Sequence, residues 1–299
     1  MGSPAPAESS TDPVQKAAAP LDRDAFTLLA TQGRLPGQSV ELRFIPVHDL
    51  QRHRVTTFFC TPVFCVQDAP VVTGYQAFQN VGAHELPFID RAILAHAVKF
   101  ARKLAGAGTV AAIGTSVHFD TLTSPKGCEI YQHALEAAGV ADHPFLVLNI
   151  EEVPDGVAAA RLIEAVGAVR PHVKRIFLRL PNIETSVLHC GHLGVSGLTV
   201  ALPPDPTRIV AMATAKWLLR ECEGQSAHSC VDHIDNDAAL ELMTVAGIHF
   251  GAGAVFGPED FRGDARPEDV EVYLADQNRA ETGEHRKSSS SDIAEHLQA

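Results

Sequence analysis

Several polar side chains stand at or near the ends of short apolar runs. His118, Asn149, Arg179 and Asp232 each follow or close such a run. A guanidinium offers a planar fork of donors that suits a phosphate, and an imidazole or an amide beside it can donate or accept hydrogen bonds. Arg179 could instead pair with Asp232 or Glu152, and we favour this ion pair because a buried arginine normally has a carboxylate partner.

Two clusters contain softer ligands of the kind that Zn²⁺ accepts. One is the run His189, Cys190, Gly191, His192, and the other contains His228, Cys230, Asp232, His233 and Asp235. In a strand over residues 229–234, alternation places Cys230 and Asp232 on one face and His233 on the other. Because the chain has 15 histidines, chance clusters are expected, and we predict no metal site.

The elements that position these residues alternate along the chain. Runs typical of strands cover residues 40–47, 55–66, 110–117, 145–150, 175–180, 198–201 and 229–234, with a further short apolar stretch at 254–256. Helical patterns cover residues 89–104, 127–138, 156–166, 206–220 and 237–246. This alternation predicts βαβ crossovers and a parallel sheet. About eight strand-like units in roughly 235 residues favour one closed α/β barrel, whose working residues lie at the carboxyl ends of the strands.

Length and composition exclude several classes of protein. The chain has 299 residues, 45% of them hydrophobic and 20% charged, which is ordinary for a globular protein. Its net charge of −12 argues against a surface for nucleic acid. No window approaches the roughly 20 apolar residues of a membrane-spanning helix, and the start lacks a secretory signal. The six cysteines lack paired spacing, so we expect a cytoplasmic protein without a membrane partner.

Composition also divides the chain. Residues 1–22 mix Pro, Ala and Ser and predict a disordered leader. Residues 23–262 hold the predicted barrel. Residues 263–299 contain nine acidic and four basic side chains and predict a polar acidic tail, mostly disordered, with a short helix near 267–275. The glycine-rich run 251–257 lacks the βαβ unit of a dinucleotide loop, and we expect its small residues to let the last strand close the barrel.

The order and spacing of several motifs resemble EAL domains, the barrel phosphodiesterases that linearise cyclic di-GMP. The resemblance runs from about Leu35 to Phe261. It is carried by Phe-Ile-Pro-Val-His-Asp-Leu at 44–50, Ile-Asp-Arg at 89–91, Ser-Val-His at 116–118, Leu-Val-Leu-Asn-Ile-Glu-Glu at 146–152, and the segment 250–257. The resemblance implies a TIM-like (β/α)8 barrel of the EAL type.

The resemblance also implies that most catalytic positions have changed. An active EAL domain binds two cations, Mg²⁺ or Mn²⁺, through hard oxygen ligands. The positions that depart from the family pattern hold Phe59 for a metal-binding Glu, Val63 for a phosphate-contacting Arg, His118 for Asn, Asn149 for Glu, Arg179 and Leu180 for paired Asp, Thr199 for Lys, and Ala201 for Asp. Asp232 and Asp235 keep the acidic type, and Glu152 matches a second Glu of its motif. The segment 181–184 replaces a glycine-bearing loop.

These departures predict a catalytically inactive EAL-like signalling protein that acts through a regulatory protein partner. We assign no catalytic residue, metal or cofactor; Mg²⁺ or Mn²⁺ is expected only if the protein is a phosphodiesterase with an atypical site. A further alternative is a receptor that binds cyclic di-GMP without hydrolysis. Homodimerisation stays open. The candidate ligand-binding residues at the barrel mouth are His118, Asn149, Glu152, Arg179, Asp232 and Asp235.

Overall fold

The structure is a computed structural model that describes residues 38–66, 72–78, 81–140, 145–256, 261–262 and 265–281. The predicted leader at 1–22 and the last part of the predicted tail, residues 282–299, lie outside the described residues. Within the described part, no helix is long and apolar enough to cross a membrane.

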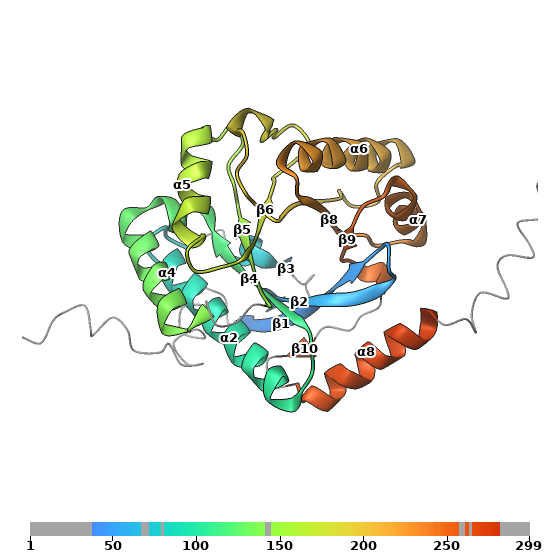
Figure 1. The fold of residues 1–299 in the computed structure, drawn as a ribbon, viewed down its shortest axis with the longest axis horizontal. Coiled ribbons are helices and arrows are strands. Elements are labelled where there is room, and N and C mark those ends of the chain that lie inside the picture. Colours follow the sequence, from blue (N-terminus) through green and yellow to red (C-terminus); the bar gives the residue numbers. More distant parts are fainter. Residues whose placement is uncertain are drawn as a thin grey trace, which may run out of the picture.

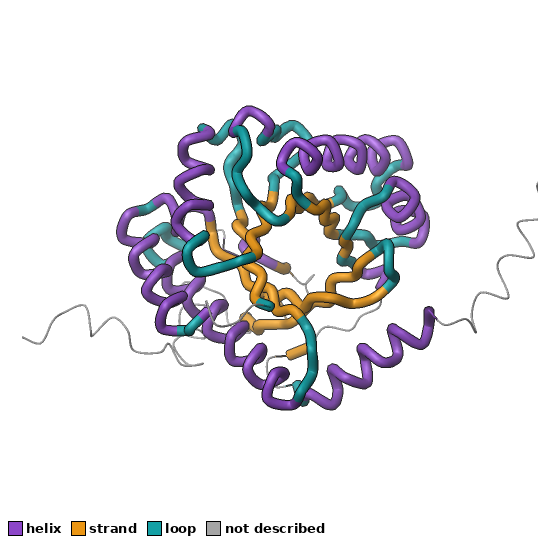
Figure 2. The backbone as a smooth tube through the Cα atoms, in the orientation of Figure 1, coloured by secondary structure: helices purple, strands orange, loops and turns teal. Residues whose placement is uncertain are grey.

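Eight strands close into a barrel (Figures 1 and 2). Around the ring they are β1 (Gln38–Asp49), β2 (Arg54–Val66), β4 (Ala112–His118), β5 (Leu146–Glu151), β6 (Arg175–Arg179), β7 (Gly197–Ala201), β8 (His228–Asp232) and β9 (Phe250–Gly251). The strands from β2 through β4 to β9 are parallel to one another. The predicted closed α/β barrel is therefore confirmed.

The first strand departs from the parallel sheet that the sequence predicted. β1 pairs antiparallel with β2 and with β9. The cause is local, because a tight turn with His53 at φ 50° joins β1 directly to β2 without a crossover helix. Two short strands, β3 (Val72–Thr73) and β10 (Phe261–Arg262), extend β2 and β1 outside the closed ring.

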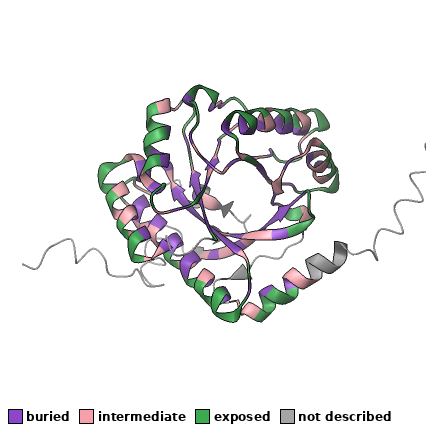
Figure 3. Cartoon of the chain, in the orientation of Figure 1, coloured by how far each residue is buried: buried purple, intermediate pink, exposed green. Residues whose placement is uncertain are grey.

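Helices surround the barrel, with their buried residues on the sides that face the strands (Figure 3). They are α2 (Leu86–Ala107), α3 (Phe119–Thr123), α4 (Pro125–Ala137), α5 (Ala159–Val169), α6 (Arg208–Gln225) and α7 (Asp237–Ala246). The side chains of Ser124, Thr207 and Asn236 accept backbone N–H groups at the starts of α4, α6 and α7, which explains where these helices begin. The predicted helices are all present, although α6 continues to Gln225, beyond the predicted end.

A longer helix occupies part of the predicted tail. α8 (Pro267–Glu281) continues past the short helix predicted at 267–275. It packs against β2 and α2, buries Val270 completely and leaves Tyr273 only 5% exposed. The hydroxyl of Thr109 donates to Glu271 Oε1 at 2.7 Å. The first part of the segment that the sequence marked as acidic tail is thus docked on the barrel.

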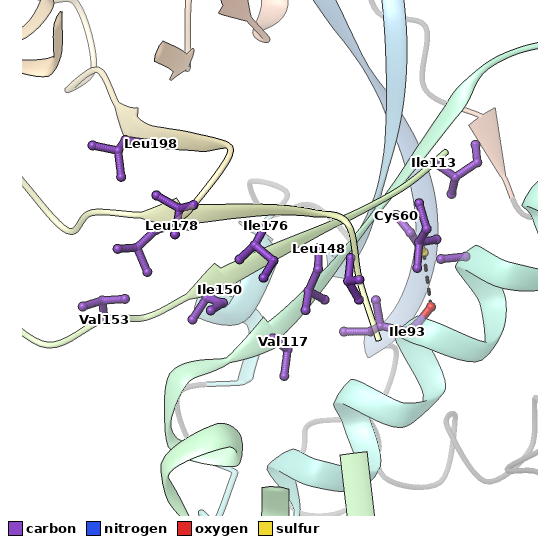
Figure 4. Packing of buried hydrophobic residues seen from close by; sticks show 14 of the residues in the cluster. Cys60, Ile93, Ile113, Val117, Leu148, Ile150, Val153, Ile176, Leu178 and Leu198 are labelled. Atoms are coloured by element: carbon purple, nitrogen blue, oxygen red, sulfur yellow. Dashed lines mark hydrogen bonds between the residues drawn. The ribbon is translucent and has the colours of Figure 1, made fainter. Parts of the chain in front are cut away.

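The main hydrophobic core lies between the strands and the helices (Figure 4). Ile113 and Val117 of β4, Leu148 of β5 and Ile176 of β6 point outward from the barrel and are at most 2% exposed. Ile93 of α2 meets this layer and is fully buried. Alternating residues of each strand therefore anchor the helices, while the intervening residues face the barrel interior.

A smaller cluster fills the barrel interior, where aromatic rings lie over glycines on neighbouring strands. Phe177 of β6 is paired with Gly197 of β7, and Phe59 of β2 with Gly114 of β4. A Cβ at Gly197 would lie 2.1 Å from the Phe177 ring. The two glycines therefore make room for the rings that form the floor of the barrel.

Replacing Gly197 by alanine should lower the free energy of unfolding by about 1–3 kcal/mol, because the added methyl group overpacks the interior. Urea unfolding of the full chain measures this loss. Gly106 of α2 is the matched control, since a Cβ there meets nothing within 4 Å. Equal stability of Gly197→Ala and Gly106→Ala would contradict the proposed fit between ring and glycine.

Candidate functional site

A cavity of about 200 Å³ opens at the carboxyl ends of the parallel strands. Its lining includes Asn149 and Glu151 of β5, Arg179 of β6, Thr199 of β7 and Asp232 of β8. These residues share one place because parallel strands end on the same face of the barrel. The mouth cavity, as we call it, is thus built from the strand ends that the sequence singled out.

Arg179 is held between two carboxylates in the mouth cavity. Its Nη1 donates to Asp232 Oδ2, and its Nε lies 3.5 Å from Glu151 Oε2. The three side chains are 25%, 20% and 13% exposed in the order Arg179, Asp232, Glu151. Burial lowers the pKa of Arg179, but Glu151 and Asp232 outweigh burial and raise that pKa above its ordinary value. The guanidinium therefore stays charged and its charge is compensated locally.

The sequence analysis considered Asp232 or Glu152 as the partner of Arg179. In the structure Asp232 forms the pair, and the second carboxylate in contact is Glu151 and not Glu152. Glu151 lies two positions after Asn149 on β5, so both side chains face the barrel interior. Glu152 follows the end of the strand, has φ 56° and is exposed at the rim of the cavity. Strand alternation from Asn149 is the signal that could have identified Glu151.

Glu151 is the most connected acidic group of the mouth cavity. Burial raises its pKa, Arg179 opposes this effect, and Asp232 and Glu152 add to it. Its Oε1 accepts a hydrogen bond from Asn149 Nδ2 at 2.7 Å and a longer one from the Ser116 hydroxyl at 3.4 Å. Glu151 thus fixes both Arg179 and Asn149.

The six predicted ligand-binding residues separate into two groups. Asn149, Glu152, Arg179 and Asp232 line the mouth cavity. His118 does not: its Nδ1 accepts from the backbone N–H of Asp120 at 3.0 Å and caps α3. Burial lowers the pKa of His118, with Asp120 and Glu152 acting in the opposite direction.

Asp235, the sixth predicted residue, also lies outside the lining of the mouth cavity. Its Oδ1 accepts from the backbone N–H of Ala254 at 2.9 Å. Asp235 therefore ties the loop after β8 to the segment after β9. The last strand packs tightly against this loop, because a Cβ at Gly251 of β9 would lie 2.6 Å from Ile234 Cδ1. Small residues do allow the last strand to close the barrel.

His233 lines the mouth cavity, although alternation predicted the opposite face from Cys230 and Asp232. The prediction failed because β8 ends at Asp232 and His233 adopts φ 61°, so the alternation stops there. Cys230 also lines the cavity, and burial raises the pKa of its thiol well above the ordinary value. Cys230 is therefore a protonated thiol at neutral pH.

A buried acid supports one wall of the mouth cavity. Tyr75 of the short helix η2 (Gly74–Phe78) lines the cavity, and its hydroxyl donates to Asp90 Oδ1. Asp90 Oδ2 accepts from the backbone N–H of His118 at 3.2 Å, so one carboxylate joins η2, α2 and the end of β4. Asp90 is fully buried, and burial raises its pKa from 3.8 to about 7. The sequence marked Asp90 as part of a motif but not as part of the site.

The residues of the mouth cavity do not fit a pair of divalent cations. A guanidinium already sits between the two most buried carboxylates. Among the residues that the structure describes, no group of three or more His, Cys, Asp and Glu side chains could hold a metal ion. In the first of the two His and Cys clusters of the sequence, His189 Nε2 lies 3.5 Å from Cys190 Sγ.

The segment after β6 is tied to its surroundings. Asn182 Nδ2 donates to both carboxylate oxygens of Asp155, at 2.9 and 3.0 Å. Further along, the fully buried carboxylate of Glu221 on α6 accepts from the Ser186 hydroxyl at 3.0 Å and from the Val187 N–H at 2.9 Å. The segment between β6 and β7 is thus fixed on both sides by carboxylates.

No family model and no curated protein sequence matches this chain. Solved structures with the EAL fold do match it. The EAL enzyme Bd1971 with bound cAMP aligns with a TM-score of 0.59 and 12% identity, covering 79% of this chain and 66% of that one. The chain thus spans about two thirds of the length of Bd1971.

Two further structures give the same result. An EAL domain protein from Listeria monocytogenes has a TM-score of 0.57 and 10% identity, with 84% of this chain and 95% of that chain covered. The FimX EAL domain of Xanthomonas citri, in complex with c-di-GMP, has a TM-score of 0.56 and 14% identity, with coverages of 75% and 88%. The chain therefore has the fold of EAL domains.

Proposed function

We propose that this chain is a non-hydrolytic regulatory module with an EAL fold, which acts through a protein partner instead of cleaving a cyclic dinucleotide. The observation that carries the proposal is the placement of Arg179 between Glu151 and Asp232. A divalent cation about 4 Å from this guanidinium would be repelled by about 4 kcal/mol per unit charge at intermediate dielectric. The two carboxylates that would attract the cation already form ion pairs with the guanidinium.

The proposal of a protein partner is supported by what the fold retains. The core between strands and helices is closely packed, although among the described residues no three His, Cys, Asp or Glu side chains are grouped to hold a metal ion. Function then rests on the outer surface, where Ile209 and Val210 at the start of α6 are 81% and 38% exposed. Affinity capture of the full chain, with Ile209→Ser as the matched variant, tests whether this surface recruits a specific protein.

The setting that we propose is the cytoplasm. Five of the six cysteines, Cys60, Cys128, Cys190, Cys222 and Cys230, are free thiols. Free thiols are typical of a reducing compartment.

A direct assay of hydrolysis tests the loss of catalysis. Purified full chain, incubated with cyclic di-GMP and Mg²⁺ or Mn²⁺, should form no more linear dinucleotide than an Asp232→Ala control, because the Arg179 guanidinium lies between the carboxylates that would bind the cation. The assay is read by chromatographic separation of the cyclic and linear forms. Metal-dependent turnover above the control would refute the proposal and support the phosphodiesterase with an atypical site.

A second candidate function is a receptor that binds cyclic di-GMP without cleaving it. The observation in its favour is the Arg179 guanidinium at the mouth, a position where a phosphate could be bound, and the FimX EAL domain was solved with this ligand. Calorimetric titration with and without Mg²⁺ separates the two candidates. Heat that Arg179→Ala abolishes supports the receptor, whereas no binding at high micromolar ligand excludes it.

A further inference from the structure

A second cavity lies at the end of the barrel opposite to the mouth cavity. Its volume is about 350 Å³, within the range of about 300–1,000 Å³ that small-ligand pockets occupy. Its lining includes Val140, Lys174 and Gly194, which stand before the first residues of β5, β6 and β7. Because the parallel strands begin on one face of the barrel, the cavity lies at their amino ends, and we call it the amino-end cavity.

The amino-end cavity lies where the ring of helices is interrupted. β6 continues to β7 through residues 180–196, which the structure describes throughout and which contain the short helix η4 (Leu188–Cys190) as their one helical turn. Figure 1 shows α5 and α6 on either side of this connection. Arg170, directly after α5, and Gly194, near the end of the connection, both line the cavity, so an irregular segment forms part of its wall.

The charges around the amino-end cavity are positive. Residues 165–183 contain three arginines and one lysine but no Asp or Glu, in a chain whose net charge is −12. Arg179 is used at the mouth, whereas Arg170, His172 and Lys174 line the amino-end cavity. None of the lining residues that the structure describes is acidic. The cavity therefore attracts an anion.

The guanidinium of Arg170 is held in place by groups that do not neutralise it. Its Nη2 donates to the backbone carbonyl of Leu193. The guanidinium also packs against Gly194, where a Cβ would lie 2.7 Å from Arg170 Cζ. Among the described residues Arg170 forms no ion pair with a carboxylate, in contrast to Arg179. A guanidinium fixed in this way offers its remaining N–H groups to a ligand at a small cost in entropy.

The amino-end cavity combines this basic side with an apolar side. Val140, Val173 and Ile176 line it and are buried. A phosphate group suits the basic side, because arginine contacts two of its oxygens with a planar fork and lysine adds a point charge. An apolar part of the ligand suits the other side, because its transfer out of water is favourable.

We propose that the amino-end cavity binds a small phosphate monoester, whose dianionic phosphate contacts Arg170 and Lys174 and whose apolar part packs on Val140, Val173 and Ile176. This site goes beyond the proposed function, which requires no small ligand. It also lies at the other end of the barrel from the mouth, where the second candidate function places cyclic di-GMP. The proposal depends on neither of these functions.

A titration with four small probes at pH 8 tests the proposal. The full chain is titrated at constant ionic strength with phenyl phosphate, which is a dianion at this pH, with inorganic phosphate, with benzoate or with benzylammonium. Binding is followed by ligand-observed NMR. We expect phenyl phosphate to bind saturably, inorganic phosphate and benzoate to bind at least fivefold more weakly, and benzylammonium not to bind. Phenyl phosphate that fails to bind, or that binds no more tightly than benzoate or inorganic phosphate, would overturn the proposal.

Variants assign the binding to the basic side of the cavity. Arg170→Met and Lys174→Met should each weaken phenyl phosphate binding at least fivefold, because each removes a charge-assisted contact. Lys174 is exposed, so its substitution should leave folding intact. Arg170→Lys keeps the charge without the planar fork and should restore only part of the affinity. Lys126→Met, at an exposed site at the start of α4, is the matched charge control and should leave binding unchanged.

Backbone amide signals locate the bound probe. In ¹H–¹⁵N spectra of the full chain, phenyl phosphate should shift the signals of His172, Lys174 and Gly194 and leave those of Thr199 and Asp232 at the mouth unchanged. Shifts confined to the mouth, or wild-type affinity in both Arg170→Met and Lys174→Met, would overturn the proposal. Hydrolysis of cyclic di-GMP would refute the proposed function alone, and a failure to bind phenyl phosphate would refute the amino-end site alone.

Discussion

Replacing Arg179 by methionine should lower the free energy of unfolding by about 3 kcal/mol at pH 7, because it leaves two partly buried carboxylates without their cation. Glu151 and Asp232 are 13% and 20% exposed and lie across the same cavity. The pKa of Glu151 is already raised by burial in the presence of Arg179, and the substitution removes the group that opposes this rise. Urea unfolding of the full chain at pH 7 measures the loss.

The same variant should recover stability as the pH falls. A carboxyl group whose pKa is raised in the folded state stabilises that state below its unfolded pKa, and this stabilisation is lost as the pH rises through the folded pKa. In Arg179→Met the pKa of Glu151 is raised further than in the wild type, because the guanidinium that lowers it is gone. More stability is then lost as the pH rises. The difference between variant and wild type should therefore be smaller at pH 5 than at pH 7.

Two controls make the result specific. The triple variant Arg179→Met, Glu151→Gln, Asp232→Asn removes the unpaired charges and should regain most of the lost stability. Arg175→Met changes an exposed arginine at the start of the same strand and should alter stability by less than about 0.5 kcal/mol. If Arg175→Met and Arg179→Met were equally stable, the ion pairs of the mouth would have no structural role.

Asp90→Asn should make the free energy of unfolding less dependent on pH, and we expect this effect to be large as well. The pKa of Asp90 rises from 3.8 to about 7 in the folded chain because the side chain is fully buried. The wild type therefore loses about 4 kcal/mol of stability from this group as the pH rises from about 4 to above 7. Asparagine does not ionise, so the variant gains relative to the wild type over this interval. Thermal or urea unfolding between pH 4 and pH 8 measures the change in slope.

The environment of Asp90 provides a second test of this assignment. The Tyr75 hydroxyl donates to the carboxylate and lowers the pKa of Asp90, opposing burial. Tyr75→Phe should therefore move the loss of stability to higher pH. Asp205→Asn is the matched control, because Asp205 is exposed at φ 45°, a conformation that asparagine tolerates. If Asp90→Asn kept the pH dependence of stability of the wild type, a group other than Asp90 would be responsible for it.

The periodicity of the apolar residues was sufficient to predict most helices and strands of the barrel. The predicted helix at 237–246 coincides with α7, and its first residue follows the capping Asn236. The closed ring followed from alternating strands and helices. The direction of β1 did not, because a strand looks the same in either direction and only the tight turn before β2 fixes it.

The candidate site was predictable where strand ends determined it. Asn149, Arg179 and Asp232 meet because their strands are parallel neighbours in one ring. Tyr75 comes from a short helix outside the repeating pattern, so no periodic signal pointed to it. His233 was misplaced because its left-handed backbone ends the alternation that the prediction assumed. Resemblance to a family could mark Asp90, but only the packing of η2 and α2 gives it a role.

The pairing of β1 with β9 has a consequence for how the chain folds. His48 pairs with Gly251, so the ring cannot close until nearly all of the barrel sequence is present. Contacts between residues so far apart in sequence form late and slow the folding of a barrel. During synthesis on the ribosome, β1 and β2 would emerge before β9 and could form a hairpin in which one edge of β1 is unpaired. An exposed strand edge of this kind favours association with other chains. Until β9 has been synthesised, the first strand therefore needs protection from association with other chains.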